Sequence, residues 1–545
     1  MQRPGMTALQ TIFEALQASV AKAPDSPFLC VPPGPDYAPE GLEWTYRDVA
    51  RRVGTLVECY RSAGYGVGHR VALLLENRPD YFVHLLALNA VGASAVPVNP
   101  DHRHDELSYQ MAHSEAVLAV CLARHVERMT AVAAALKTGI AVVDAEKVIA
   151  GLPSAPTAAV HRPLDRATEA AVFYTSGTTG RAKGCRVTND YWLSAGEWFI
   201  NLSRDGGRFR MEAGRDRLFN PMPVFHVHAG VVAFMPMLLT QGCLIRPDHF
   251  QAKRWWRDVI ATKATIVHYI GVVPQALLAQ AESDEERRHQ VKWGFGAGME
   301  PSLHASFEAR FGFPHVEVWG MTEVGRWLAD HREPRQVGAR AIGRPFDALE
   351  AKVVDIEDHD VPHGTEGELV VRLSGPDPRR GFFSGYVKDD AATEEGWRGG
   401  WWHTGDIVRQ APDGMIHFID RKKNLIRRSG ENIAPAEIEA LLYGHAAVER
   451  VAILPIPDET RGEEILACIV PAPGKTADAA LADSLFGYCL KHLAYYKAPG
   501  WIVFFESLPL TPTQKVSKVQ IFSSGQDPRH YPGAIDLRAK KRRSA

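Results

Sequence analysis

The sequence has few cysteines, and they lie far apart. The seven stand at positions 30, 59, 121, 185, 243, 468 and 489, an odd number with no C-x-x-C pair. This spacing argues against a disulfide framework and against a structural zinc site. A reducing, cytosolic setting is therefore expected.

An excess of charge and long apolar runs are also missing. The 62 Lys and Arg against 64 Asp and Glu leave a net charge of −2, so nothing in the composition indicates a nucleic acid or an acidic partner. The most apolar stretch, 231–245, is interrupted and too short to span a bilayer. In place of a secretory signal, residues 1–26 carry apolar side chains at helical spacing. We expect a soluble protein with a surface helix at this position.

Basic residues gather near the C-terminus, at Arg538, Lys540, Lys541, Arg542 and Arg543. Such a run can grip a phosphate. A solvated, disordered tail is the expected alternative, because segments at chain ends are poorly ordered unless other contacts hold them.

At about 150 residues per domain, 545 residues indicate three or four structural units. Short β-type runs alternate with helical patterns, for example at 71–75, 81–91 and 95–98, which predicts an α/β body of parallel sheets covered by helices. Near residue 420 an aromatic, glycine-rich region gives way to a polar string and a compact βα pattern. We place a domain boundary there.

The segment Tyr174 to Gly184, YTSGTTGRAKG, is the most informative part of the chain. Its glycines allow backbone N–H groups to approach an anion, its hydroxyls donate hydrogen bonds, and its Lys supplies charge. It fails as a Walker A motif because Ala182 and Gly184 stand where Gly and Ser or Thr are required. A phosphate-binding loop and an ordinary turn both remain open for this segment on its own.

Six further motifs follow in one order. They are PVFHVHAG (223–230), GAGMEP (296–301), WGMTEVG (319–325), WWHTGDI (401–407), DRKKNLIRRSGENIAPAEIE (420–439) and PLTPTQKVSK (509–518). The ordered set resembles the superfamily of AMP-forming adenylating enzymes, from about Thr45 to Ile521. The wording DRKKNLIRRSGENI resembles the carnitine- and crotonobetaine-CoA ligase branch.

The resemblance implies a fold and an activity. The fold is a large α/β N-terminal domain of several subdomains (1–420), with parallel and mixed sheets covered by helices. A hinge (421–423) leads to a small, mobile α+β C-terminal domain (424–545). The activity is ATP-dependent acid:CoA ligation, in which an acyl-AMP forms with release of pyrophosphate and the acyl group then passes to the CoA thiol. Transfer to a carrier protein, and a non-catalytic nucleotide- or acyl-binding descendant, are the alternatives.

The resemblance also assigns residues. For ATP it implies Thr175, Ser176, Gly177, Thr178, Thr179, Gly180 and Lys183 at the phosphates, and Gly296, Ala297, Gly298, Trp319, Gly320 and Met321 on the adenine side. Thr322 is implied at the α-phosphate, Glu323 at Mg²⁺, and Asp406 with Arg421 at the ribose, where a carboxylate suits hydroxyl donors. Lys515 is the implied catalytic ammonium, placed where negative charge develops as the α-phosphorus is attacked. Lys423 is implied at the hinge, Arg428, Ser429, Gly430 and Glu431 at CoA, and His226, with His228 a weaker candidate, at the mouth of the acyl pocket.

Four positions depart from the family pattern, namely Ala182, Cys185, Asn189 and Gln514. They leave the efficiency of adenylation open, Gln514 most of all, because a position that needs positive φ strains Gln. We expect the pocket walls at 192–198, 226–232 and 294–299. An apolar or cyclic acid, a cationic acid against aromatic faces, and a dicarboxylic acid all remain open. A homodimer is the base-rate expectation.

Overall fold

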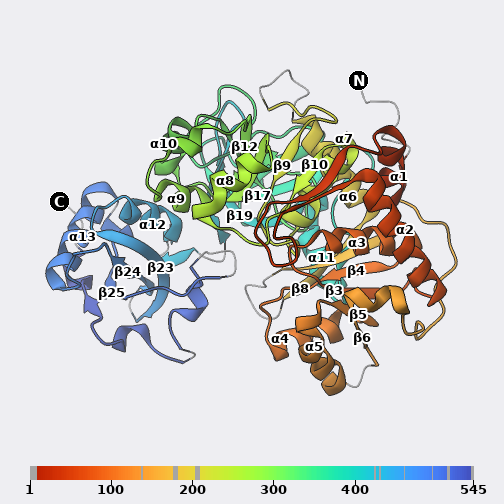
Figure 1. Cartoon of the computed structure of the whole chain (residues 1–545). Coiled ribbons are helices and arrows are strands. Elements are labelled where there is room, and N and C mark those ends of the chain that lie inside the picture. The colour runs from red at the N-terminus through yellow and green to blue at the C-terminus, as the bar shows by residue number, and fades with distance from the viewer. Residues whose placement is uncertain are drawn as a thin grey trace.

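The computed structural model describes residues 9–136, 139–175, 182–202, 209–422, 425–428, 431–459, 461–493, 495–511, 516–523 and 525–541. Within these residues the strands form four sheets. Three of the sheets belong to a large N-terminal body, and the fourth forms a smaller body at the C-terminal end, drawn in blue (Figure 1). No helix in the described part of the chain is long and apolar enough to cross a membrane.

The first sheet has the strand order β18-β8-β7-β4-β3-β5-β6, and its central strands are parallel. Its strands are β3 (Arg70–Leu74), β4 (Ser94–Pro97), β5 (Leu118–Cys121), β6 (Ala141–Asp144), β7 (Glu169–Thr175), β8 (Lys183–Thr188) and β18 (Gly385–Tyr386). Helices α2 (Tyr46–Ser62), α3 (Pro79–Val91), α4 (His104–Ser114) and α5 (Ala123–Leu136) alternate with them along the chain. This confirms the parallel α/β architecture predicted from the alternating pattern. The antiparallel pairing of β7 with β8 closes a hairpin around the glycine-rich loop.

The second sheet has the order β14-β13-β12-β11-β9-β10-β1-β2. Its strands are β1 (Pro27–Val31), β2 (Leu42–Thr45), β9 (Arg217–Phe219), β10 (Cys243–Ile245), β11 (Ile266–Ile270), β12 (Trp293–Ala297), β13 (His315–Trp319) and β14 (Leu328–Ala329). Its helices are α1 (Ile12–Lys22), α6 (Asn189–Asn201), α7 (Phe234–Thr240), α8 (Trp255–Ala261), α9 (Val272–Leu278) and α10 (Pro301–Phe311). The expected N-terminal helix is α1, which starts with Thr11 as its N-cap.

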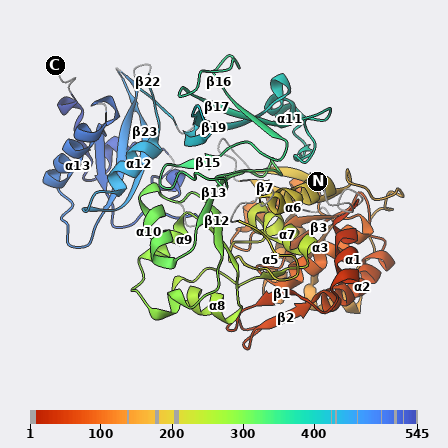
Figure 2. The same ribbon diagram turned by 90° about the horizontal axis from the view of Figure 1, so that it is seen from above.

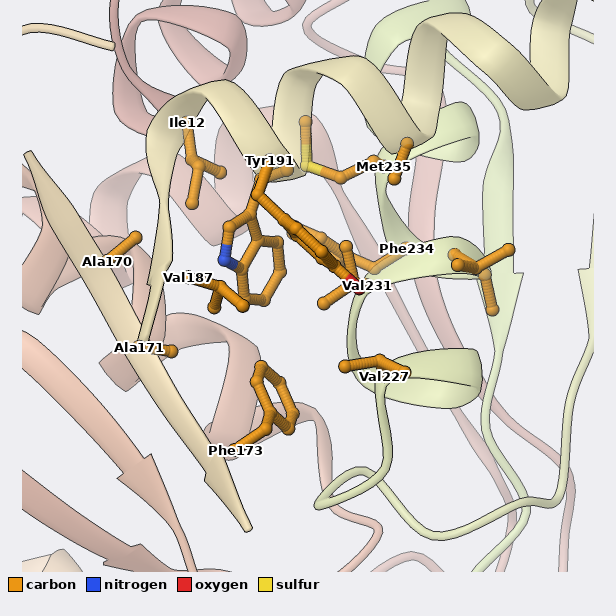
Figure 3. Packing of buried hydrophobic residues seen from close by; sticks show 14 of the residues in the cluster. Ile12, Ala170, Ala171, Phe173, Val187, Tyr191, Val227, Val231, Phe234 and Met235 are labelled. Atoms are coloured by element: carbon orange, nitrogen blue, oxygen red, sulfur yellow. The ribbon is translucent and has the colours of Figure 1, made fainter. Parts of the chain in front are cut away.

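One core joins the two large sheets. Figure 3 shows Ile12 from α1 and Tyr191 from α6 packed over Phe173 of β7, with Val231 and Phe234 closing the other side. Helix α3 is buried around most of its circumference, as expected for a helix that carries apolar side chains on all faces. Because the segment 227–235 is part of this core, it fixes the position of the FHVH motif (225–228), which overlaps its start.

The third sheet was not predicted. It is antiparallel, with the order β15-β20-β19-β17-β16, and α11 (Asp390–Gly396) lies beside it. Its strands are β15 (Ala341–Gly343), β16 (Leu349–Val354), β17 (Glu366–Leu373), β19 (Trp402–Gln410) and β20 (Ile416–Arg421). The aromatic, glycine-rich region seen in the sequence is the approach to β19, and the predicted boundary near residue 420 falls at the end of β20.

The C-terminal body has its own core. Its strands are β21 (Ile426–Arg428), β22 (Glu431–Ile433), β23 (Val448–Asp458), β24 (Gly462–Pro471), β25 (Trp501–Phe504) and β26 (Ile535–Asp536), with helices α12 (Pro435–Tyr443) and α13 (Ala479–His492). Its two apolar clusters consist of residues from Ile426 onward, whereas the clusters of the N-terminal body end at Phe418. Figure 2 shows this body set to one side of the larger one.

The expectation of a solvated C-terminal tail is wrong for Lys541, whereas Arg538 and Lys540 are exposed but held in ion pairs. Lys541 has 1% of its side chain exposed, and its Nζ lies 2.7 Å from Glu464 Oε1. Arg538 pairs with Asp458 at 3.0 Å, and Lys540 pairs with Asp483. The acidic partners stand 57 to 80 positions earlier in the chain, so the local sequence did not reveal them.

Candidate active site

The glycine-rich loop begins and ends on a rigid hairpin. Thr175 and Lys183 are register partners at the open end of β7 and β8, and Thr175 Oγ1 donates to Lys183 O at 3.4 Å. The hydroxyl of Tyr109 donates to the carbonyl oxygen of Ala182 at 2.8 Å. Ser176, Gly177, Thr178, Thr179 and Gly180 lie outside the described residues. The hairpin therefore fixes both ends of the predicted phosphate loop.

Lys183 and Glu323 converge on one tyrosine. The Tyr386 hydroxyl donates to Glu323 Oε1 at 2.7 Å, and Lys183 Nζ lies 4.6 Å from the centre of the Tyr386 ring. Asp389 accepts from the other side, with Oδ2 at 3.2 Å from Lys183 Nζ. The predicted phosphate-binding cation thus lies over the Tyr386 ring, and the predicted metal-binding carboxylate lies at the Tyr386 hydroxyl.

Glu323 suits a magnesium ion bound together with phosphate. Burial raises the pKa of its carboxyl, and the hydrogen bond from Tyr386 partly offsets that rise. Among the residues that can be described, no group of three or more His, Cys, Asp or Glu side chains could hold a metal by itself. Mg²⁺ commonly takes one or two carboxylates, with substrate phosphates and water as its other ligands. A single buried carboxylate near a phosphate loop fits that pattern.

Trp319, Asp406 and Arg421 form the second convergence. Trp319 ends β13, and its Nε1 donates to Asp406 Oδ2 at 2.7 Å. Asp406 and Arg421 are register partners on β19 and β20, and Arg421 Nε lies 2.6 Å from Asp406 Oδ1. Burial raises the pKa of Asp406, whereas the charge of Arg421 and the Trp319 hydrogen bond oppose that rise. An aromatic ring and a carboxylate are therefore held side by side, as the adenine and ribose assignments require.

The GAG segment leaves β12 beside Trp319. Gly298 has φ +80°, a left-handed conformation that a side chain would strain. The backbone N–H of Gly298 donates to Glu317 Oε1 at 2.5 Å, and that of Met299 donates to the same carboxyl at 3.3 Å. Burial raises the pKa of Glu317 to about 8 despite these two hydrogen bonds. Gly296 and Ala297 form the last residues of the strand.

The turn after Trp319 brings Thr322 and Glu323 to the site. A Cβ on Gly320 would lie 2.2 Å from the Trp327 ring, so only glycine fits there. Met321 is half-buried against the core, and its carbonyl accepts from Val324 N at 3.2 Å. Thr322 lies in this turn, between Met321 and Glu323.

The FHVH segment packs against a cluster of aromatic side chains. The carbonyl of His226 accepts from Ala229 and Gly230, and its ring lies 4.6 Å from that of Phe225. The His228 ring stacks on His268 at 5.0 Å and lies 5.7 Å from Trp327. Two of the stretches expected to line the acyl pocket also meet here, since the ring centroids of Trp198 and Phe295 lie 6.1 Å apart.

The C-terminal site residues are described only in part. Lys515, Lys423, Ser429 and Gly430 lie outside the described residues. Glu431 is the register partner of Arg428 in the β21–β22 hairpin, and Arg428 Nε donates to Glu464 Oε2 at 2.8 Å in the domain interior. The Arg428 side chain thus supports the hairpin from within the C-terminal domain.

Asn189, one of the four departures, has a structural role. Its Oδ1 accepts from Asn89 Nδ2 at 2.8 Å, and its own Nδ2 donates to the Asp165 carbonyl at 2.9 Å. It lies at the first turn of α6, where it connects that helix to α3 and to the segment before β7. The departure at this position therefore involves packing and not the residues of the site.

Sequence reasoning missed three residues of the site, namely Tyr386, Asp389 and Glu317. Tyr386 stands 63 positions from the carboxylate that it contacts. None of the three belongs to a spacing pattern with a chemical meaning of its own. Only the folded chain brings them to the site.

Comparison with known proteins agrees with this geometry. The family model described as "AMP-binding enzyme" matches residues 16–387, and the model of its C-terminal domain matches residues 437–515. The chain belongs to the AMP-binding enzyme family. The first match covers well over half of the chain and includes Lys183, Trp319, Glu323 and Tyr386. Asp389, Asp406 and Arg421 lie between the two matched ranges.

Named relatives of this AMP-binding enzyme are CoA ligases. A sulfoacetate–CoA ligase of Cupriavidus necator is 30% identical over 94% of this chain and 98% of its own length. A feruloyl-CoA synthase of Amycolatopsis is 31% identical over 88% and 94%, and a crotonobetaine/carnitine–CoA ligase of Proteus mirabilis is 27% identical over 87% and 92%. The resemblance expected from the motifs is confirmed.

Solved structures share the fold. ATP-bound MatB from Rhodopseudomonas palustris superposes with a TM-score of 0.80 at 24% identity, covering 94% of this chain and 98% of that one. The o-succinylbenzoate CoA synthetase of Bacillus subtilis, bound to its acyl-adenylate, gives 0.79 at 20% identity with the same coverage. The expected fold, a large N-terminal α/β part with a small C-terminal domain, is confirmed.

Proposed function

We propose that this AMP-binding enzyme is an acid:CoA ligase that uses the two convergences as one nucleotide site. The observation that carries the proposal is the placement of Lys183 and Glu323 around Tyr386, next to the Trp319–Asp406–Arg421 group. A phosphate-binding cation, a metal-binding carboxylate, an aromatic face and a ribose-binding carboxylate are the parts that MgATP requires. They come from three segments of the chain, because Trp319 and Glu323 belong to one motif.

In the first half-reaction, a carboxylate oxygen of the acid attacks the α-phosphorus, and the bond to the β-phosphate breaks with release of pyrophosphate. Lys183 and the loop 175–180 hold the phosphates, and Thr322 donates to the α-phosphate. Mg²⁺ bound to Glu323 would neutralise phosphate charge. Lys515 supplies the ammonium that stabilises charge as it develops, a contribution of about 3 kcal/mol by comparison with other preorganised donors.

Trp319 and the segment 296–298 position the adenine, and Asp406 accepts hydrogen bonds from the ribose hydroxyls with Arg421 beside it. Glu317 acts indirectly, because it holds the backbone of Gly298 and Met299 in place. A substrate bound through so many fixed groups loses its freedom before the reaction, which lowers the barrier.

In the second half-reaction, the CoA thiol sulfur attacks the acyl carbon and AMP leaves. We propose that the C-terminal domain (424–545) turns about residues 421–423, with Lys423 as the hinge, between the two steps. The separate core of that domain supports this, because such a domain can move as a unit. The turn 428–431 would then approach CoA, and His226 would stand at the mouth of the acyl pocket.

Pyrophosphate release from MgATP tests this function. It is measured over a panel of short, aromatic, dicarboxylic, sulfonated and betaine-type acids, each with and without CoA, and products are identified by mass. Acid-dependent release with a CoA thioester supports the ligase. Adenylation without a thioester would indicate another acyl acceptor, and binding of ATP without turnover of any acid would contradict the proposal.

A further inference from the structure

We propose that the acyl pocket contains a second anion subsite built from Arg246, Asn220, His268 and His228, and that the preferred acid carries a second anionic group such as a carboxylate or sulfonate. This inference rests on the ligase function proposed above and names the substrate class of the same site. Nothing in the motif set assigns a role to Arg246 or His268.

Arg246 is a buried cation that lacks an acidic partner. It follows β10 directly and has 0% of its surface exposed. Nη1 donates to Asn220 Oδ1 at 3.1 Å, and Nη2 donates to the Met222 carbonyl at 2.5 Å. Its Nε has no hydrogen-bond partner, and no described Asp or Glu forms an ion pair with it. The two bonds that it makes fix the guanidinium without neutralising it.

Two histidines extend this group toward the acyl pocket. Asn220 Nδ2 lies 3.3 Å from His268 Nδ1, so the amide connects Arg246 to His268. The centroid of the His268 ring lies 4.6 Å from that of Phe295 and 5.0 Å from that of His228, and the latter two lie 5.9 Å apart. The Nε2 atoms of both histidines are buried and have no hydrogen-bond partner. Three buried polar atoms, Arg246 Nε, His268 Nε2 and His228 Nε2, therefore have no hydrogen-bond partner. Their residues are connected by contacts from Arg246 through Asn220 and His268 to His228.

The same residues belong to the walls expected for the acid. His228 lies in the segment 226–232, and Phe295 lies in the segment 294–299. Met222, whose carbonyl Arg246 binds, stands four residues before His226 at the start of the FHVH segment. The subsite is therefore connected through one short loop to the position assigned to the pocket mouth.

Charge decides which ligand suits this arrangement. A buried charge without a partner is costly, and a bound anion removes that cost while it accepts charge-assisted hydrogen bonds. Burial lowers the pKa of Arg246 to about 9 and that of His228 to about 3, so near pH 7 the guanidinium keeps its charge and His228 is neutral. A betaine-type acid would place a second cation beside the guanidinium, so this pocket disfavours it despite its aromatic walls.

Matched pairs of acids test the subsite. We compare kcat/KM for succinate, malonate and sulfoacetate with that for butanoate and propanoate, in wild-type enzyme and in Arg246→Met. Wild type is expected to prefer the anionic acids by about 30-fold or more, because desolvated charge pairs contribute at least this much. The ratio of anionic to neutral acid is expected to collapse in Arg246→Met. Arg217→Met is the control, since it removes a half-buried Arg of neighbouring β9 that pairs with Glu43, and its ratio should match wild type.

Each result has a distinct meaning. If wild type converts neutral acids as well as anionic ones, or if Arg246→Met keeps the wild-type ratio, the subsite is wrong while the ligase function stands. If no acid of any class releases pyrophosphate, the ligase function itself fails. Should Arg246→Met not fold, His268→Phe is compared on the same acids. If that variant also fails to fold, the ratio of kcat/KM for anionic to neutral acids in wild type tests the subsite alone.

Discussion

The indole Nε1 of Trp319 donates a hydrogen bond of 2.7 Å to Oδ2 of Asp406, although the two residues stand 87 positions apart. Trp319 ends a strand of the second sheet, and Asp406 lies in the third. This bond joins the two sheets at the nucleotide site. It also leaves Asp406 with Arg421 on its other oxygen, so the carboxylate has a fixed orientation before ATP binds.

Replacing Trp319 with Phe keeps an aromatic face and removes only the N–H. Because a hydrogen bond to a charged acceptor contributes about 1.5 kcal/mol or more, we expect the KM for ATP to rise about 10-fold. Acid-dependent pyrophosphate release over a range of ATP concentrations measures this. Trp401→Phe is the control, because the Trp401 ring contacts Arg372, whose Cζ lies 4.1 Å from the ring centroid, and within the residues that the structure describes it makes no hydrogen bond with Asp406. An unchanged KM in Trp319→Phe would show that the bond does not position the ribose carboxylate.

Trp319, Glu323, Asp406 and Lys183 could be assigned to the nucleotide site from the sequence, because each belongs to a short motif of the family. The parallel sheet was also predictable, since alternation of β-type and helical patterns is a local signal. The third sheet was not: two of its four pairings join strands that follow each other along the chain, but glycines at 343, 367 and 405 break the hydrophobic pattern of β15, β17 and β19.

Partners at long range account for the other misses. Tyr386 and Arg246 acquire meaning only from what they touch, and a lone Tyr or Arg in a sequence predicts nothing. The tail at Lys541 shows the reverse error: a basic run looks solvated until Glu464 is placed beneath it.

Tyr386→Phe tests the connection between the phosphate loop and the carboxylate. The Tyr386 hydroxyl favours the ionised form of Glu323, so its removal raises the pKa of that carboxyl further. At low pH a larger fraction of Glu323 is then protonated and unable to bind Mg²⁺. We expect the acidic limb of the pH–rate profile to move to higher pH, and more Mg²⁺ to be required for half-maximal rate.

Tyr60→Phe is the matched control for that experiment. It removes another buried hydroxyl, one that lies 2.8 Å from His84 Nδ1, far from the site in the core of the first sheet. Its pH–rate profile should coincide with wild type. A Tyr386→Phe profile that also coincides with wild type would show that Glu323 does not depend on this tyrosine.

Glu317→Gln tests the support of the GAG segment through the pH dependence of stability. Burial raises the pKa of Glu317 from its ordinary value of 4.5 to about 8 in the folded chain. The folded state therefore keeps a proton that the unfolded chain releases. The stabilisation is complete below 4.5 and is lost as pH rises toward 8.

We expect wild type to lose more unfolding free energy than Glu317→Gln between about pH 5 and about pH 8, because the amide does not titrate. Urea unfolding at both values measures the difference. Glu449→Gln, an exposed carboxylate on β23, should behave as wild type. Equal pH dependence in wild type and Glu317→Gln would mean that Glu317 is not protonated at neutral pH.

Lys541→Met tests whether the end of the chain is part of the C-terminal domain. Lys541 and Arg428 both bind Glu464, and the three side chains are buried with at most 3% exposure. Lys541→Met leaves Arg428 and Glu464 as a one-to-one pair but removes the buried hydrogen bond that Lys541 Nζ donates to Glu464 Oε1, so we expect a loss of about 2 kcal/mol in unfolding free energy. Lys540→Met removes the adjacent charge, whose pair with Asp483 is about half exposed, and should cost less than about 1 kcal/mol. Urea unfolding and limited proteolysis of the C-terminal domain distinguish the two variants. If both variants unfold at the same urea concentration as wild type, Lys541 contributes nothing to that domain, and the tail is a solvated extension after all.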